Sequence, residues 1–423
     1  MESAKASEDP DQHEAGGTAA FRAPSPSSPP PPPFGRASPR EDDALFTRPF
    51  LGLLGMQAAY GFSFSMFFLL PKYLATLGEG ASRIGFVMGG FGVACILTIP
   101  FLPRILGTLG RRGALSAATL LLAVAAVAFA LVPRPGLMAI PLRAAEGVTW
   151  TIMFSTAIAL TAEMSPPHRL AQAIGLAGAA SLIMNALAPA IGEPLADRFG
   201  YRSAFLLSAL AALGAAALAH RLPASATEVG GHVAPSRPPH PGHANSGPGR
   251  RSLYLVFGLA GLAFSVLFTF LAPFALGHGV RAIRSFFIAY TASALAVRVL
   301  GGRMADRLGH ASVAAWAVFF YGGVVASTGL LGAHHLAVLG LGFGLCHGAV
   351  YPALMALLVG GAKPDQRPRV LGIANGCMSL GISAVFPAGL LVKPLGYGAV
   401  FALAGGLTAA SAFLLRRRQP QRK

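Results

Sequence analysis

The strongest constraint in this sequence is a succession of apolar runs that begins at Phe50 and continues almost to the C-terminus. Each run is roughly 20 residues long, which is the length of helix that crosses a bilayer. In lipid only helices and closed barrels satisfy every backbone polar group, and the runs lack the alternation of barrel strands. The sequence therefore predicts twelve transmembrane helices. They are expected at 50–70, 83–102, 114–132, 137–160, 170–192, 203–220, 252–276, 284–301, 311–331, 336–358, 370–391 and 397–415.

The apolar runs form two groups of six, which predicts an all-α integral membrane protein with two six-helix halves. The Pro- and Ser-rich beginning of the chain cannot bury an apolar core, so it is expected to be a disordered cytoplasmic tail. A segment rich in Pro, Gly and His separates the two groups and is expected to be a solvated linker. The predicted segments are an N-tail (1–48), a first half (49–221), a linker (222–251), a second half (252–416) and a basic C-tail (417–423).

The distribution of charge indicates how the chain crosses the membrane. The formal net charge is +17, although only 12% of the residues are charged. A basic chain can bind either nucleic acid or a membrane, and the location of the charges decides between them. The two tails, the linker and the loops on the same side hold most of the 33 Lys and Arg residues. The positive-inside rule then predicts cytoplasmic N- and C-termini in an inner or plasma membrane, and no nucleic-acid partner is needed.

The two halves repeat short sequence patterns at an almost constant spacing. The Pro-x-x-Arg pattern at 166–169 recurs at 364–367. A proline followed closely by Gly192 recurs before Gly389. Parallel repeats of this kind are typical of secondary transporters.

Four motifs carry a resemblance to a known family. The sequence Gly-Arg-Met-Ala-Asp-Arg-Leu-Gly at 302–309 is similar to a Gly-x-Leu-Ala-Asp-Arg-x-Gly loop signature, and residues 143–147 are similar to an Arg-x-x-x-Gly motif. Residues 188–192 resemble the Gly-Pro-x-x-Gly motif of exporters, and residues 163–169 match a common helix end. With these motifs the chain resembles the Major Facilitator Superfamily, in its efflux-permease-like branch. The resemblance covers 46–418 and implies two six-helix halves, a small-molecule substrate, a lipid bilayer as surroundings and a monomer.

The resemblance also implies a gate on the cytoplasmic side, formed by the loop signature of each half. In the first half Pro103 and Gly107 replace the first glycine and the aspartate of the signature, so only its end remains. The alternative is that these basic residues only set the topology. The expected gate residues are Gly302, Arg303, Asp306, Arg307, Gly309, Gly110, Arg111, Arg112, Glu163 and Arg169.

Charged side chains inside a span cost about 2.5–3.5 kcal/mol each on insertion scales, so each one needs a reason. Glu146 is the one carboxylate placed clearly within a predicted span, and Arg143 lies one turn away on the same helix face. In one interpretation Glu146 carries a proton and Arg143 adjusts the pKa of its carboxyl group. In the other, the two residues form a fixed structural pair. His347, near the middle of the tenth span, is a further candidate for a proton carrier or substrate contact. Its alternative role is a neutral histidine bonded to the backbone.

In the family that the chain resembles, the first, fourth, seventh and tenth helices line a central cavity. The polar and aromatic residues on these helices and their neighbours are therefore cavity candidates, although such side chains also form ordinary hydrogen bonds between helices. The low content of charge in the spans favours a lipophilic or weakly polar substrate. The candidates are Gln57, Tyr60, Ser63, Trp150, Asn185, Tyr290, Tyr351 and Asn375.

These features predict a secondary transporter, not an enzyme, which exports small organic molecules by alternating access in exchange for protons. The chain has no phosphate-binding Gly-x-x-x-x-Gly-Lys-Ser/Thr loop and no compact metal-binding pattern, so we expect no cofactor and no metal. The expected energy source is the proton gradient. Two alternatives remain open. One is a facilitative importer or uniporter without ion coupling, and the other is a polytopic sensor or membrane enzyme without transport.

Overall fold

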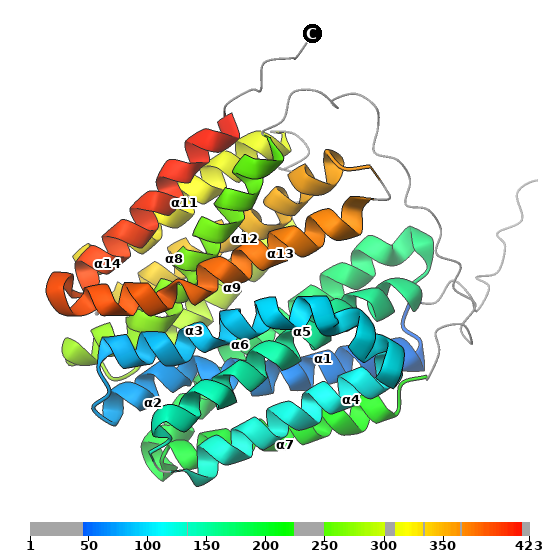
Figure 1. The fold of residues 1–423 in the computed structure, drawn as a ribbon, viewed down its shortest axis with the longest axis horizontal. Coiled ribbons are helices and arrows are strands. Elements are labelled where there is room, and N and C mark those ends of the chain that lie inside the picture. Colours follow the sequence, from blue (N-terminus) through cyan, green and yellow to red (C-terminus); the bar gives the residue numbers. More distant parts are fainter. Residues whose placement is uncertain are drawn as a thin grey trace, which may run out of the picture. The chain divides into compact units, whose positions relative to one another are not determined.

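The computed structural model describes residues 45–132, 134–223, 249–300, 309–332, 335–363 and 366–416, and every regular element among them is a helix (Figure 1). The described residues belong to one compact unit, Asp43–Lys423. Most of the predicted N-tail, linker and C-tail lies outside the described residues. The same is true of four predicted gate residues, namely Gly302, Arg303, Asp306 and Arg307.

The helices follow the predicted apolar runs. The first half contains α1 (Arg48–Met66), α2 (Leu70–Thr76), α3 (Ala81–Thr98), α4 (Leu102–Leu131), α5 (Ala139–Glu163), α6 (Leu170–Phe199) and α7 (Tyr201–His220). The second half contains α8 (Arg250–Gly277), α9 (Arg284–Leu300), α11 (His310–Leu331), α12 (Leu336–Gly360), α13 (Arg367–Ser383) and α14 (Val385–Arg416). Short 3-10 turns, η2 (Phe67–Leu69) and η3 (Ile99–Phe101), continue the chain into α2 and α4.

Eight stretches of described helix are long and apolar enough to cross a membrane. Two of them, Ala81–Leu131 and Arg369–Arg416, each hold two predicted spans, because the helix direction changes at a non-helical glycine, Gly110 or Gly396. The predicted spans 137–160 and 284–301 correspond to α5 and α9. Every predicted span is therefore helical along nearly all of its described residues, which is consistent with twelve crossings.

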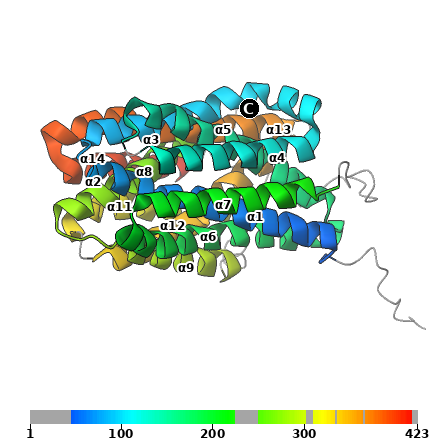
Figure 2. The same ribbon diagram turned by 90° about the horizontal axis from the view of Figure 1, so that it is seen from below.

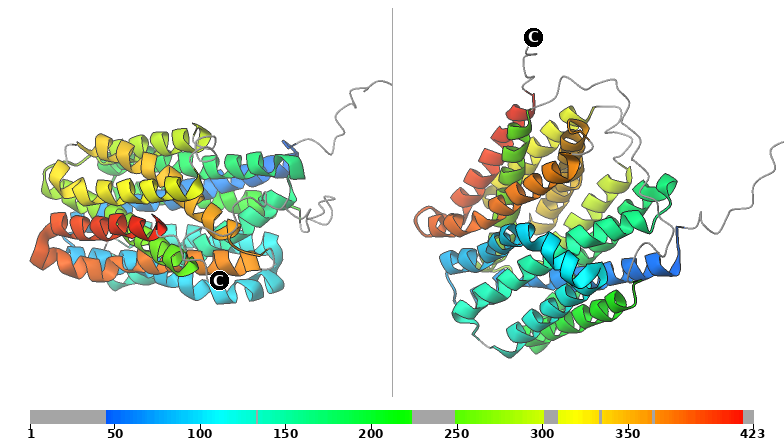
Figure 3. Two further views of the ribbon diagram at one scale, coloured as in Figure 1. Left: turned by 90° about the horizontal axis from the view of Figure 1, so that it is seen from above. Right: turned by 45° about the vertical axis from the view of Figure 1, so that its right-hand side comes forward.

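The two halves have the same helix pairing. In the first half α1 packs on α6 and α7, α3 packs on α5, and α4 packs on α7. In the second half the equivalent helices repeat the pattern: α8 packs on α13 and α14, α9 on α12, and α11 on α14. The two sets of helices form separate groups in Figure 1 and in the right-hand view of Figure 3. Glycines with positive φ also occur as matching pairs in the two halves: Gly78 with Gly279, Gly110 with Gly309, Gly136 with Gly332, and Gly200 with Gly396.

The halves meet along two lines of contact. One joins α3 to α13 and α14, the other joins α6 to α9, and α2 also reaches α8 (Figure 2). Glycines allow the backbones to approach: a Cβ atom on Gly85 would lie 2.8 Å from the carbonyl oxygen of Val385 and 3.2 Å from the Cα of Gly389. Small residues at such positions are typical of helix packing in membranes.

The outward surface of the helices is apolar, as a lipid environment requires. Large side chains such as Leu97, Val124 and Leu210 are 61–65% exposed. In water this much exposed apolar surface would promote aggregation, whereas in a bilayer it faces hydrocarbon. The described structure is thus that of a multi-pass membrane protein.

Candidate functional site

Arg143 and Glu146 form a buried ion pair within α5. They are three residues apart, and their side chains are 6% and 0% exposed. The Arg143 guanidinium also lies over the ring of Phe91 in α3, 4.8 Å from its centroid. Glu146 Oε1 and Arg143 Nε are buried without a hydrogen-bond partner. One carboxylate oxygen is therefore neutralised and the other is open, and an open buried oxygen is a position at which a proton can be held.

Tyr60, a predicted cavity residue of α1, contacts the α5 segment that holds this pair. The Tyr60 hydroxyl is hydrogen-bonded to Oγ1 of Thr149 at 3.1 Å, and Thr149 Oγ1 donates to the backbone oxygen of Glu146 at 2.9 Å. Gln57, one turn before Tyr60, is 7% exposed, and its Nε2 has no hydrogen-bond partner. The structure thus brings Tyr60 to the α5 segment that holds Glu146. Thr149 was missed by the sequence analysis, although it lies three residues after Glu146.

The other predicted residues of the first half mostly bond to neighbouring helices. Ser63 is hydrogen-bonded to Ser208 of α7 at 2.9 Å, which is the ordinary inter-helix role considered from the sequence. Asn185 of α6 accepts a hydrogen bond from Ser65 at 2.7 Å. Trp150 is half-buried and stacks on Phe64 with ring centroids 4.7 Å apart.

In the second half His347 belongs to an aromatic cluster. Its Nδ1 is 3.2 Å from the Tyr290 hydroxyl, and its ring stacks on Phe343 at 5.5 Å. The Tyr351 hydroxyl donates to Oδ1 of Asn375 at 3.3 Å, so four predicted residues form two pairs. A small pocket of ≈ 10 Å³, about the space of one water molecule, opens beside them. It is lined by Phe257, Ala260, Tyr321, His347, Val350, Tyr351, Leu354 and Met378. Its lining is mainly aromatic and aliphatic, with hydroxyl and imidazole groups.

The loop expected to form part of a cytoplasmic gate holds a surface ion pair. Arg111 follows Gly110, whose φ of 65° ends the preceding helical segment, and it pairs with Glu163 at the end of α5. Gly309 has a φ of 81° at the equivalent place in the second half. Arg112 and Arg169 are half-buried. Among the described residues no group of three His, Cys, Asp or Glu side chains could hold a metal ion.

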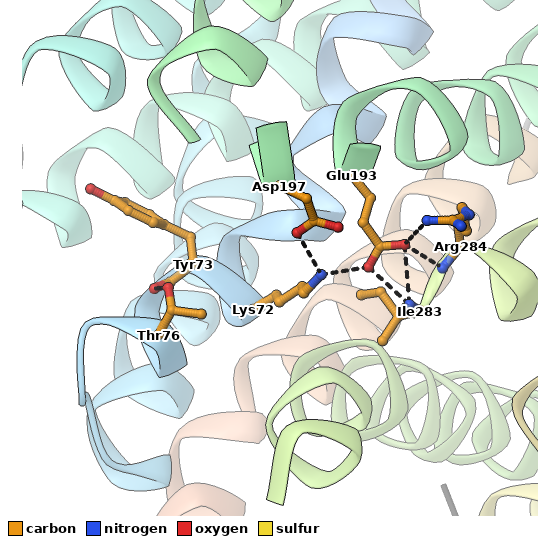
Figure 4. Close-up of polar contacts among 7 residues, drawn as sticks. All are labelled: Lys72, Tyr73, Thr76, Glu193, Asp197, Ile283 and Arg284. Atoms are coloured by element: carbon orange, nitrogen blue, oxygen red, sulfur yellow. Dashed lines mark hydrogen bonds and ion pairs between the residues drawn. The ribbon is translucent and has the colours of Figure 1, made fainter. Parts of the chain in front are cut away.

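A second buried carboxylate corrects the expectation that Glu146 alone is deeply embedded. Glu193 is 1% exposed, because α6 continues to Phe199 instead of ending near residue 192. Its Oε1 lies 2.6 Å from Nζ of Lys72, which is 3% exposed and belongs to α2, beyond the predicted span 50–70. Glu193 Oε1 also accepts the backbone N–H of Ile283 at 2.8 Å, and Oε2 accepts that of Arg284 at 2.9 Å (Figure 4).

Aromatic rings from the two halves also contact one another, and one of these rings is near Lys72 in the sequence. Phe68, four residues before Lys72, lies 5.0 Å from Phe268 of α8 and 5.5 Å from Phe287 of α9 by ring centroids. All three side chains are buried. We call the end of the bundle that holds these rings, Lys72 and Glu193 the distal end, since α1 and α2 lead to it from Arg48. The described distal end is closed by these contacts.

Comparisons with known proteins agree with this architecture. The family model of the Major Facilitator Superfamily matches residues 51–332 and 253–423. No curated protein matches the chain significantly by sequence.

Three solved structures illustrate the likeness in fold. The human organic anion transporter MFSD10 (TETRAN) is 18% identical with a TM-score of 0.63, covering 87% of this chain and 99% of its own. The nucleoside transporter NupG is 12% identical with a TM-score of 0.67, covering 87% and 99%. The xylose transporter XylE from E. coli, in an inward open conformation, is 14% identical with a TM-score of 0.69, covering 90% and 98%. At these identities the likeness extends to the fold alone.

Proposed function

The chain belongs to the Major Facilitator Superfamily, and we propose that it exports small organic molecules across a membrane in exchange for protons. Its family and its helical architecture make it a multi-pass membrane transporter and not an enzyme. The proposal concerns the direction of transport, the coupling to protons and the class of substrate.

The observation that carries the proposal is the partnering of Glu146. A fully buried carboxylate needs strong compensation, and here one oxygen has Arg143 while the other has no hydrogen-bond partner. A proton on the open oxygen would neutralise the carboxylate and free Arg143 for another acceptor. Binding and release of a proton at Glu146 would thus change the charge at the α1–α5 contact, beside Tyr60. This is the type of local change that couples a proton to a movement of helices.

The surroundings of the candidate site support an organic substrate of low charge. The small pocket of the second half presents Tyr321, His347 and Tyr351 among apolar side chains. Aromatic walls bind flat or lipophilic molecules, and a few hydroxyl or imidazole groups set their orientation. We assign the predicted cavity residues Gln57, Tyr60, Trp150, Tyr290, Tyr351 and Asn375 to substrate contact or to its support.

The charge asymmetry of the loops supports cytoplasmic termini in a plasma or inner membrane. In that orientation the distal end faces outward, and the Arg111–Glu163 pair lies on the cytoplasmic side. We propose a monomer as the working unit, since each chain contains both six-helix halves.

The test is transport by proteoliposomes of a compound that comparative metabolomics finds retained in cells with the protein deleted. The proposal predicts accumulation against a concentration gradient when a pH gradient is imposed, and loss of accumulation when a protonophore removes that gradient. Equilibration at the same rate with and without the pH gradient would instead support a facilitative carrier.

A further inference from the structure

Glu193 connects the two halves of the molecule at the distal end. The carboxylate comes from α6 in the first half, and its two backbone donors are Ile283, directly before α9 in the second half, and Arg284, the first residue of α9. The guanidinium of Arg284 also approaches Glu193 Oε2, at 3.8 Å. Figure 4 shows these groups converging on the one carboxylate.

The contact with α9 is a helix cap supplied by the other half. The first N–H groups of a helix have no partner within it, and a side-chain oxygen just before the helix usually accepts them. Here the residue before α9 is Ile283, whose side chain has no acceptor. The Glu193 carboxylate accepts the N–H groups instead, and its negative charge also interacts favourably with the positive end of the helix dipole.

Lys72 neutralises the Glu193 carboxylate from within the same half of the molecule. It lies in α2 of the first half, 2.6 Å from Glu193 and 3.6 Å from Asp197, which is 52% exposed. If the halves separate at the distal end, Lys72 stays with both carboxylates. Only the hydrogen bonds to α9 and the Arg284 contact are then lost, and water can replace them.

We infer that Glu193 is a latch that holds the distal gate closed by capping α9 across the interface, while Lys72 keeps the latch charged and in place. The inference deepens the proposed function, because a latch matters only if the halves move apart during transport. Two features keep the distal end closed: the Glu193 latch and the rings of Phe68, Phe268 and Phe287. The rings exclude water by packing, and the carboxylate supplies directional bonds that break and re-form.

Distances between spin labels on the two halves test the latch without any substrate. Gly80 and Gly277 are suitable label positions at the distal end, because a Cβ atom at either one meets no other atom within 4 Å. The three native cysteines, Cys95, Cys346 and Cys377, are replaced by alanine in this background. In Glu193→Gln we expect a second population with a longer distance between the labels. Because the charged acceptor is lost, the ratio of the open to the closed population should rise about tenfold or more. Glu79→Gln, which breaks the Glu79–Arg83 surface pair inside the first half, should leave the distribution unchanged.

Two further comparisons separate capping from simple charge pairing. Exchanging the charges, Lys72→Glu with Glu193→Lys, restores an ion pair but presents an ammonium to the α9 N–H groups, so the open population should persist. Arg284→Pro removes one of the capped N–H groups at a helix start, where proline is tolerated. It should raise the open population more than Arg284→Ala, which removes only the guanidinium.

An unchanged distance distribution in Glu193→Gln would overturn the latch, as would recovery of closure by the charge exchange. If Glu193→Gln does not fold, the Arg284 pair decides, and equal distributions in Arg284→Pro and Arg284→Ala would reject the cap. The labels report closure even in a chain that moves no compound. Failure of proton-driven accumulation with an intact response of the labels would therefore reject the proposed function and leave the latch standing.

Discussion

Glu146 and Glu193 are both buried in the first half of the molecule, but their oxygens are partnered differently. Glu146 pairs with Arg143 of its own helix, and its second oxygen has no hydrogen-bond partner. Glu193 places both oxygens on donors, from Lys72 and from the start of α9. Burial alone therefore does not define the role of a carboxylate in this fold.

The difference separates a group able to exchange a proton from a group that fixes a structure. Burying a charge is tolerated when hydrogen bonds and an opposite charge compensate it fully. Glu193 meets this condition with partners from both halves, so any change in its charge would weaken the closed distal end. Glu146 meets it with one oxygen only, and its pair can rearrange inside one half without separating the two.

The largest expected effect on stability is that of Glu193→Ala. The substitution leaves buried Lys72 with only the more distant Asp197 and leaves two N–H groups of α9 uncapped. We expect the free energy of unfolding to fall by about 3–5 kcal/mol, as for other broken buried pairs. Thermal unfolding of the purified protein measures the loss. Glu79→Ala is the control, since its surface pair with Arg83 should contribute about 1 kcal/mol or less.

Phe68→Ala and Phe64→Ala form a matched pair. They compare a ring at the contact between the halves with a ring packed inside the first half. The two side chains are 7% and 8% exposed and lie one turn apart. Each truncation should cost about 3–5 kcal/mol in stability. Of the described ring contacts of the two side chains, those of Phe68 reach the second half, at Phe268 and Phe287, and those of Phe64 stay within the first. Phe68→Ala alone should therefore lengthen distances between the halves at the distal end. Equal distance changes in the two variants would contradict a local aromatic seal.

Tyr60→Phe tests the surroundings of Glu146 with a smaller change. The substitution removes the hydroxyl that bonds to Thr149 while the ring remains packed. We expect a loss of about 1 kcal/mol in stability, the typical net contribution of one hydrogen bond. Proton-driven accumulation should weaken without being lost, because the Arg143–Glu146 pair remains. A complete loss of accumulation would indicate that the proton binds at Tyr60 instead of Glu146.

The smallest effect is expected for Arg111→Ala. Arg111 is 45% exposed in its pair with Glu163, and solvent screens such pairs. The change in stability should be below about 1 kcal/mol by thermal unfolding. A loss comparable with that of Glu193→Ala would mean that this exposed pair stabilises the first half as strongly as the buried contacts of Glu193.

The sequence predicted the helices, the repeat of the halves and the Arg143–Glu146 pair, because these follow from hydropathy and from spacing along one helix. It missed the environment of Glu193 for a physical reason. Pro194 directly after Glu193 resembles the end of a helix, yet α6 continues through it to Phe199. The partners at 283 and 284 are backbone N–H groups far along the chain, and a backbone donor leaves no signal in a sequence. Lys72 lies just beyond the predicted span 50–70 for a similar reason, since Pro71 suggests a helix end but lies in the first turn of α2.

The most direct test of the account compares proton-driven accumulation by proteoliposomes that contain Glu146→Gln or Glu193→Gln. We predict that Glu146→Gln still exchanges labelled for unlabelled compound but no longer accumulates it when a pH gradient is imposed. We predict that Glu193→Gln changes the rate of transport, while its steady-state accumulation still rises with the pH gradient. Full gradient-driven accumulation by Glu146→Gln, or loss of the gradient dependence in Glu193→Gln alone, would contradict the assignment of the proton to Glu146.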